Sequence, residues 1–197
     1  MLSDLDQSAG TRLVPFAREL YIEQDDFREV PPPKYHRLSP GQEVRLRAAY
    51  IVRCEKVITN DRGEVVEIHC TYDPDTKSGA AAANRRVKGT IHWVSSRQAV
   101  DMEVRLYDRL FVREDPNEAS GSGDFLQNLN PNSLEVLTHC KGEPMLASAR
   151  GGARYQFERM GYFCADTNDS RPGAPVFNRI VTLRDTWAKI AQRQVDR

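Results

Sequence analysis

Two arginines stand one residue apart in the otherwise apolar run "QEVRLRAAY", residues 42–50. If this run forms a β-strand, Arg45 and Arg47 point to the same face, because side chains alternate along a strand. Val44 and Leu46 then point to the opposite face. The conservative interpretation is a half-buried strand whose solvent face carries charge. The alternative is a strand that presents guanidinium groups to an anionic ligand.

Two further stretches combine basic and aromatic residues: "KYHR" (34–37) and "YQFERMGYF" (155–163). On a strand, Tyr155, Phe157 and Arg159 share one face and the two polar residues between them share the other. Unstacked RNA bases are held on aromatic or guanidinium planes and read on their edges by Arg, Gln and Glu. This inventory suits the recognition of single-stranded RNA, although aromatic residues on strands more often pack in a core.

Metal binding is not expected. His-Cys occurs twice, at 69–70 and 139–140, but adjacent strand residues face opposite sides and cannot both reach one ion. Asp73 and Asp75 have a calcium-like spacing. The intervening proline and the missing distal glutamate favour a turn there instead.

The sequence contains none of the common local catalytic or nucleotide-binding motifs. There is no G-x-x-x-x-G-K-[ST], G-x-G-x-x-G, G-x-S-x-G or H-E-x-x-H pattern. An active site assembled from dispersed residues stays open as an alternative. The residues favour a binding module.

Composition limits the function classes. The 197 residues carry 28 basic and 28 acidic side chains, so the net charge of zero argues against a general polyanion binder and requires any RNA contact to be a local patch. No apolar run is long enough to span a membrane, and the first ten residues lack the features of a secretion signal. The four cysteines show no C-x-x-C spacing, which predicts free thiols and a cytoplasmic location.

The chain predicts a series of short strands separated by turn residues. They lie at 12–23, 43–60, 64–75, 86–96, 100–112, 153–169 and 175–186. A hairpin is expected around "DRG" (61–63) and a loop at 76–85. Helical patterns are limited to short stretches near 124–129 and 182–194. Such a pattern is typical of an all-β barrel or sandwich.

Six blocks, in order from residue 12 to residue 190, resemble the C-terminal anticodon-binding region of glutaminyl-tRNA synthetases. They are "PFARELYIEQDDFRE", "YHRLSPGQEVRLRAAYIVRCEKV", "VKGTIHWVSS", "VRLYDRLF", "YQFERMGYFCAD" and "PVFNRIVTLRDTWAK". The His-Trp pair and the Leu-Arg-Asp-Thr-Trp ending favour the glutaminyl over the glutamyl enzymes.

The resemblance implies an all-β fold of two β-barrels with short helices, of a type also found in a ribosomal 5S RNA-binding protein. The distal barrel is inserted into the proximal one. We therefore expect residues 13–30 and 102–190 in the proximal barrel, 31–101 in the distal barrel, and 1–12 as a flexible lead-in.

The resemblance also implies a class I aminoacyl-tRNA synthetase whose N-terminal domain uses ATP and Mg²⁺ to join glutamine to tRNA-Gln. The two adenylate-forming motifs of that domain have no counterpart in this chain. We therefore expect this chain to bind tRNA-Gln as a monomer, to need no cofactor and to be inactive alone.

Site roles follow from the resemblance by position. Arg45 matches the reader of the first anticodon base and Arg37 the arginine associated with the third base. Gln156 and Glu158 match the pocket for the middle base, and Arg159 ends that run. Possible contacts to the RNA backbone are Lys34, His36, Arg47 and Thr186.

The chain departs from the family pattern at two positions. His36 stands where bacterial members have lysine, and Ala48 stands where they have asparagine after the second arginine. Because a histidine with an ordinary pKa of about 6.5 is mostly neutral at pH 7, its hold on a phosphate is weaker and depends on pH. The family's middle-base pocket also uses an arginine from further upstream.

Two alternatives remain. One is a ribosomal-type barrel protein that binds structured RNA without reading an anticodon. The other is a protein-interaction module of a synthetase complex.

Overall fold

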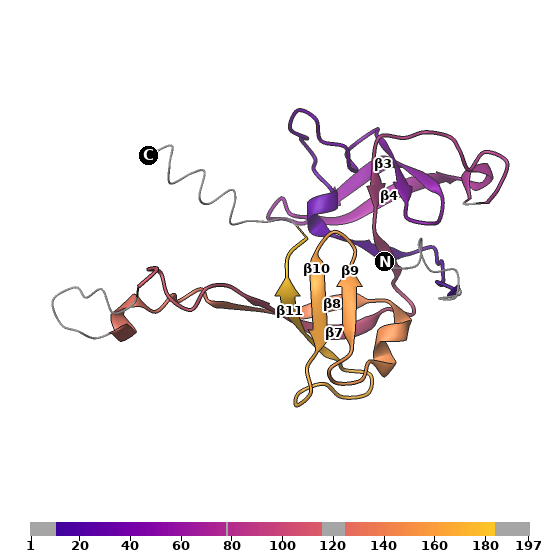
Figure 1. Ribbon diagram of the computed structural model, residues 1–197. Coiled ribbons are helices and arrows are strands. Elements are labelled where there is room, and N and C mark those ends of the chain that lie inside the picture. The colour runs from indigo at the N-terminus through magenta and orange to yellow at the C-terminus, as the bar shows by residue number, and fades with distance from the viewer. Residues whose placement is uncertain (1–10, 78, 116–124, 184–197) are drawn as a thin grey trace. The chain divides into compact units, whose positions relative to one another are not determined.

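A computed structural model describes residues 11–77, 79–115 and 125–183 (Figure 1). Its longer regular elements are strands, and its helical elements are 3-10 helices of three to five residues. The predicted all-β class is therefore confirmed. The chain divides into two compact units, which we call the first unit (residues 16–97) and the second unit (residues 98–183 together with 11–15).

The first unit contains a four-stranded and a two-stranded sheet. The four-stranded sheet has the order β4-β3-β2-β5, with antiparallel pairs except for the parallel pair β2 and β5. The two-stranded sheet pairs β1 with β6. The strands are β1 (Leu20–Ile22), β2 (Glu43–Leu46), β3 (Ile51–Thr59), β4 (Val65–Asp73), β5 (Thr90–Ile91) and β6 (Trp93–Ser95).

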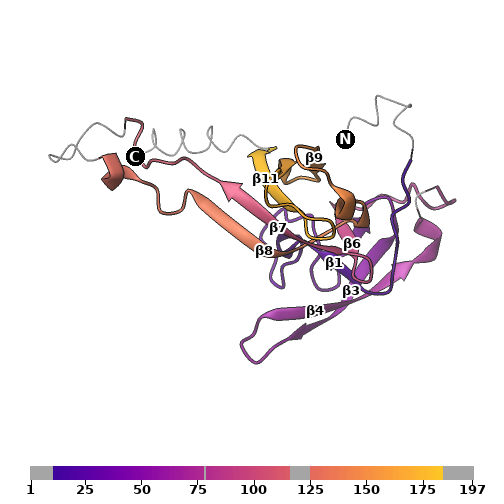
Figure 2. The ribbon, with the colours of Figure 1, turned by 90° about the horizontal axis from the view of Figure 1, so that it is seen from below.

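Strands β3 and β4 form the hairpin predicted around residues 61–63, and they lie side by side in both views (Figure 1, Figure 2). The Oδ1 atom of Asn60 accepts the backbone N–H groups of Arg62 and Glu64, each at 3.0 Å. Gly63 has a φ of 77°, which a residue with a Cβ rarely adopts. These local contacts explain why the turn was readable from sequence.

The strand β2 buries Val44 and Leu46 in the core of the first unit, as alternation predicted. The prediction that Arg47 shares a strand face with Arg45 is wrong, because β2 ends at Leu46. The chain reverses there through a tight turn, in which the Leu46 N–H donates to the Tyr50 carbonyl and Ala48 has a φ of 55°. The core comprises Phe27, Leu38, Val44, Leu46, Ala49, Val52, Cys54, Ile91 and Trp93.

The second unit is built on one five-stranded sheet with the order β8-β7-β11-β10-β9. The pair β7 and β11 is parallel and the other pairs are antiparallel. The strands are β7 (Val100–Tyr107), β8 (Leu134–Gly142), β9 (Arg154–Phe157), β10 (Gly161–Ala165) and β11 (Val176–Val181). Its core comprises Met102, Val104, Leu146, Phe163, Ala165 and Phe177.

The helical elements are short. They are η2 (Gln24–Asp26), η3 (Pro74–Thr76), η4 (Phe125–Asn128) and η5 (Pro144–Ser148). The helix predicted near 124–129 is confirmed as the single turn η4. The helix predicted over 182–194 falls almost entirely outside the described residues. In the part of the chain that the structure describes, no helix has the length and apolar character needed to cross a membrane.

The two units differ from the expected barrel ranges at two points, one of which is that residues 98–101, expected in the distal barrel, group with the second unit. Residues 16–30 group with the first unit because β1 pairs with β6, whereas the resemblance assigned 13–30 to the proximal barrel. Among the described residues, the two edge strands of the four-stranded sheet and of the five-stranded sheet are not hydrogen-bonded to each other, so neither sheet closes on itself. The barrel ranges therefore stay a prediction. Within the expected lead-in, Arg12 forms a bidentate ion pair with Glu143, with both N–O distances at 2.9 Å.

Candidate nucleic-acid interface

The Arg45 guanidinium is held by backbone carbonyl groups of the loop at 76–85. Its Nη1 donates to the Thr76 oxygen at 2.9 Å and, over a longer 3.5 Å, to the Ala49 oxygen. Its Nη2 donates to the oxygens of Ala83 at 2.8 Å and Arg85 at 3.0 Å. Four of the five guanidinium N–H groups are thus directed at carbonyls within the described structure. The half-buried side chain has a fixed orientation, and its base-reading role stays a prediction.

The loop that holds Arg45 is itself anchored at both ends. The buried Thr76 hydroxyl accepts the Ile51 N–H at 2.9 Å and donates to the Asp73 carbonyl at 2.6 Å. At the other end, Arg85 forms a bidentate pair with Glu43, with N–O distances of 2.9 and 3.1 Å. This ion pair lowers the pKa of Glu43 below its ordinary value, chiefly through the hydrogen bonds from Arg85.

Arg37 is paired with a buried carboxylate. Its Nη1 lies 2.9 Å from Oδ1 of Asp26, whose side chain is fully buried. Nη1 also donates to the Asp25 carbonyl at 3.2 Å, and the Tyr35 hydroxyl donates to the same oxygen at 3.0 Å. Burial is the main cause that raises the Tyr35 pKa. Arg37 therefore has a structural partner before any RNA is bound.

The KYHR stretch contacts the backbone segment that is hydrogen-bonded to Arg45, and the contact is made at Gly89. The Gly89 carbonyl accepts the Arg45 N–H at 2.9 Å. A Cβ atom on Gly89 would lie only 2.0 Å from the His36 carbonyl oxygen, so no larger residue fits there without displacement. The structure thus brings two of the predicted RNA-contacting stretches together in the first unit, although they are eight residues or more apart in sequence.

The residues proposed to contact the RNA backbone are placed as follows. The side chains of Lys34, His36 and Arg47 are exposed. Lys34 has a φ of 64° at the turn after the prolines. The backbone of Arg47 bonds to residues of β5 and β6: its N–H donates to the Ile91 carbonyl and its carbonyl accepts the Trp93 indole N–H, both at 3.0 Å. Thr186 lies outside the described residues.

In the second unit, three aromatic residues of "YQFERMGYF" pack in or against the core: Tyr155, Phe157 and Phe163. Tyr155 stands edge-on to Phe177 with ring centroids 5.5 Å apart. Phe157 stacks on Phe163 at 4.3 Å. The conservative interpretation, core packing rather than base stacking, is therefore correct for Tyr155 and Phe157.

The strand face predicted for Arg159 and Glu158 is wrong, because β9 ends at Phe157. The Met160 N–H donates to the Phe157 carbonyl at 3.0 Å, and Arg159 takes a φ of 63°. Gly161 follows with a φ of 149°, at a site where a Cβ would lie 2.4 Å from the Val181 carbonyl oxygen. The chain thus turns sharply where strand alternation would have continued.

Gln156 is exposed on the outer face of β9, and Tyr162 of β10 is its cross-strand partner. Tyr162 pairs in turn with Val181 of β11, and its side chain is 44% exposed. Directly opposite residues on antiparallel strands have Cβ atoms about 4.5–5.5 Å apart. Tyr162 was not among the site residues predicted from the sequence. The glycine in "ERMGY" was the available signal, since it marks a turn that returns Tyr162 to the level of Gln156.

A polar network connects β7, β11 and the loop after β10. Asp166 accepts the backbone N–H groups of Asn168 and Asp169, each at 2.8 Å, and the Asn178 amide at 2.7 Å. These bonds lower the Asp166 pKa, the Asp169 N–H most of all. Arg105 pairs with Asp169 at 2.7 Å. This network is structural.

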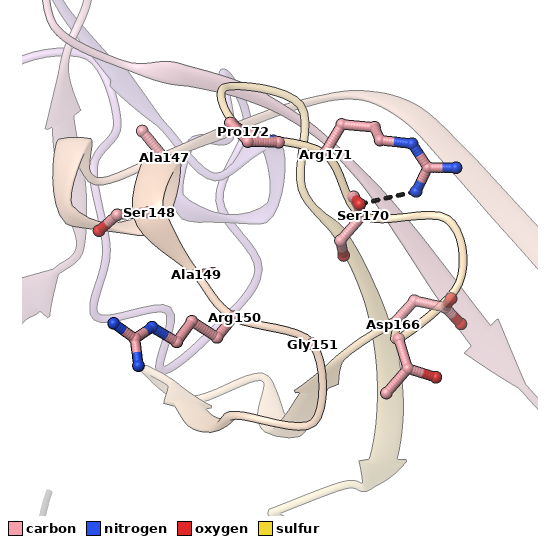
Figure 3. A pocket seen from close by; sticks show the side chains of 10 residues that line it. Ala147, Ser148, Ala149, Arg150, Gly151, Asp166, Ser170, Arg171 and Pro172 are labelled. Atoms are coloured by element: carbon pink, nitrogen blue, oxygen red, sulfur yellow. Dashed lines mark hydrogen bonds between the residues drawn. The ribbon is translucent and has the colours of Figure 1, made fainter.

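A surface pocket of about 380 Å³ lies near this network, lined by parts of 147–151 and 166–172 (Figure 3). Arg171 on its rim donates to the Ser170 carbonyl at 2.8 Å. None of the described residues carried over by resemblance lines this pocket. No cluster of three or more His, Cys, Asp or Glu suited to a metal ion is found in residues 11–77, 79–115 and 125–183.

Comparison with known proteins identifies the class to which this all-β chain belongs. Two family models, both described as the anticodon-binding domain of class I tRNA synthetases (E and Q), match residues 3–73 and 90–166. The chain therefore belongs to the family of anticodon-binding domains of class I tRNA synthetases for glutamate and glutamine.

The curated relatives are glutamine–tRNA ligases. The chain is 54% identical to that of Pseudomonas putida over 181 residues, which is 92% of this chain and 32% of the relative. It is 53% identical to that of Stutzerimonas stutzeri over 183 residues, which is 93% of this chain and 33% of the relative. The relative from Azotobacter vinelandii is 54% identical, with the same coverage. The chain thus spans about a third of the length of the relatives it matches.

Proposed function

We propose that this chain binds the anticodon of tRNA-Gln and thereby selects that tRNA for glutaminylation. The observation that carries the proposal is its membership of the anticodon-binding family together with relatives named glutamine–tRNA ligase. Activation of glutamine with ATP and Mg²⁺ would require a catalytic part outside these 197 residues. In this proposal the chain acts in the cytoplasm as a monomer and binds no cofactor of its own.

The exposed face of β9 and β10 supports a role in reading the middle base. A uracil edge requires both a donor and an acceptor, and the Gln156 amide offers both. Its exposed position on the strand makes the amide accessible to a base that has been splayed out of the anticodon loop. One well-formed bidentate contact contributes about 1–3 kcal/mol of discrimination.

The arginines of the first unit support the reading of the outer bases in a different way. Arg45 and Arg37 are both half-buried, and both are oriented by hydrogen bonds to backbone carbonyls. An arginine with a fixed side chain loses less conformational freedom when it binds a ligand. In this proposal a base contacts the accessible part of each guanidinium or exchanges for one of its carbonyl partners.

The test is a fluorescence titration of the chain with a tRNA-Gln anticodon stem-loop and with stem-loops changed at one anticodon base, at one fixed salt concentration. Tight binding of the first and at least about tenfold weaker binding of the others is expected. Arg45→Ala should lower binding of the cognate RNA far more than binding of the RNA changed at the first base. Arg62→Ala, in the exposed β3–β4 turn, is the control for loss of one positive charge.

Equal affinity for all stem-loops would contradict the proposal. It would favour the alternative that the chain is a ribosomal-type barrel protein, which binds structured RNA without reading an anticodon. Association with other synthetase components that survives RNase, without any RNA binding, would favour an interaction module. Exchange of pyrophosphate into ATP by this chain with glutamine would contradict the placement of catalysis elsewhere.

A further inference from the structure

Glu43 and Arg45 lie on the same face of β2, two residues apart, and both reach the loop at 76–85. Glu43 does so through its carboxylate, which binds both terminal nitrogens of Arg85 at 2.9 and 3.1 Å. Arg45 does so through its guanidinium, which donates to the Arg85 carbonyl at 3.0 Å. Arg85 is therefore bound by its side chain to one residue of the strand and by its backbone to the other.

These contacts form a closed cycle through Glu43, Arg85 and Arg45. The cycle begins and ends on one strand, so the position of the Arg85 carbonyl is set relative to the backbone that carries Arg45. Ala83, two residues earlier in the loop, supplies a second carbonyl to the same Nη2 atom at 2.8 Å. Asp73 of β4 adds a longer contact to Arg85 at 3.8 Å. The orientation of the Arg45 guanidinium thus depends on the position of the loop carbonyls that accept its hydrogen bonds.

The two ends of the loop are held differently. At the start, the buried Thr76 hydroxyl bonds to the backbone of β3 and of Asp73. At the end, the Glu43–Arg85 pair is more than a third exposed on both sides. An exposed ion pair contributes little to overall stability, typically about 0–1 kcal/mol. Its removal should therefore release the end of the loop without unfolding the unit.

We propose that Glu43 and Arg85 are positioning residues for Arg45: their ion pair fixes the loop carbonyls that orient the Arg45 guanidinium for the first anticodon base. The inference rests on the proposed function, in which Arg45 reads that base. It adds two residues that act through Arg45 without contact to the RNA. It also predicts that specificity at the first base depends on the Glu43–Arg85 ion pair, although the folded unit does not require this pair for its stability.

The test uses the full 197-residue chain with Glu43→Gln and Arg85→Gln, titrated with the cognate stem-loop and with stem-loops changed at the first or the middle base. Each variant should lose about three- to tenfold of the discrimination at the first base and keep its discrimination at the middle base. The double variant should lose no more than either single variant, because both changes break one pair. The exchanged pair Glu43→Arg with Arg85→Glu should recover part of the loss.

A second readout follows Arg45 directly and needs no RNA. In NMR spectra, the guanidinium N–H signals of Arg45 should be protected from exchange with solvent in the original chain and lose that protection in Arg85→Gln. Arg28→Gln is the matched control, since it breaks another exposed ion pair of the first unit, Arg28–Asp25 at 2.8 Å. It should change neither readout.

The outcomes separate this inference from the proposed function. If Arg45→Ala weakens binding of all stem-loops equally, Arg45 does not read the first anticodon base and its role in the proposed function fails. If Arg45→Ala abolishes discrimination at the first base while Arg85→Gln keeps both the discrimination and the protected signals, only the positioning role is overturned. Loss of folding in Glu43→Gln or Arg85→Gln, measured by thermal unfolding, would also overturn it, because the pair would then be needed for stability.

Discussion

Arg37 lies 2.9 Å from a carboxylate oxygen of Asp26, and the Asp26 side chain is fully buried. A buried carboxylate is costly unless it is paired and hydrogen-bonded. The arginine that the family resemblance associates with the third anticodon base therefore also acts as a counterion inside the first unit. Effects of its substitution on RNA binding must be separated from effects on folding.

Replacement of Arg37 by alanine should lower the free energy of unfolding by on the order of 3 kcal/mol, because it leaves the buried Asp26 without this cation. Urea denaturation followed by circular dichroism measures the change. Arg28→Ala is the matched control, since Arg28 pairs at 2.8 Å with the exposed Asp25 next to it. It should cost less than about 1 kcal/mol. Equal costs for the two variants would contradict the structural role of Arg37.

Asp166 should make the second unit sensitive to acid. Its folded pKa is lower than the ordinary value of 3.8, so the folded state favours the charged carboxylate. The resulting stabilisation is present above the unfolded pKa and is lost as the pH falls through the folded pKa. Asp166→Asn should be clearly less stable than the original chain at pH 7, and the difference should shrink below about pH 4.

Thermal unfolding between pH 3 and pH 7 measures this dependence. Asp61→Asn in the exposed β3–β4 turn is the control and should shift the melting temperature little. A gap between the original chain and Asp166→Asn that stays constant over this pH range would contradict the prediction.

Cys70 should react slowly with alkylating reagents at pH 8. Burial of its thiol, with smaller contributions from Cys54 and Glu55, raises the Cys70 pKa to about 12, although the residue as a whole is exposed. Because the thiolate is the reactive form, only a very small fraction is available at this pH. Iodoacetamide labelling with mass-spectrometric mapping should find Cys70 modified far more slowly in the folded than in the urea-unfolded chain. Similar rates in the two states would contradict it.

Tyr162 should contribute to RNA binding if Gln156 reads the middle base, because the two residues are cross-strand partners on an exposed face. Stacking of a base on an aromatic ring contributes about 1–3 kcal/mol. Tyr162→Ala should therefore weaken binding of the cognate stem-loop about five- to hundredfold, whereas Tyr162→Phe should retain most of the affinity. Phe125→Ala, an exposed aromatic on η4, is the control. Unchanged affinity for Tyr162→Ala would exclude stacking at this position.

Two predictions that rest on local sequence pattern are confirmed by the structure. Alternation placed Val44 and Leu46 in the core, and turn residues located the β3–β4 hairpin. Alternation failed where a strand ended early, at Leu46 and at Phe157. In both cases a non-glycine residue with positive φ, Ala48 or Arg159, makes the turn. Such residues carry little turn signal in a sequence, because positive φ is uncommon for them.

The sequence by itself determined the all-β class, the residue types able to contact RNA and, through six ordered blocks, the family. Only the tertiary structure decided what surrounds those residues. Arg45 reaches carbonyls 31 to 40 positions later in the chain, and Arg37 reaches a carboxylate that was not part of the predicted site. Periodicity reflects which face of an element is buried. It does not encode which distant backbone group meets a long polar side chain, since that depends on how the loops close over the sheet.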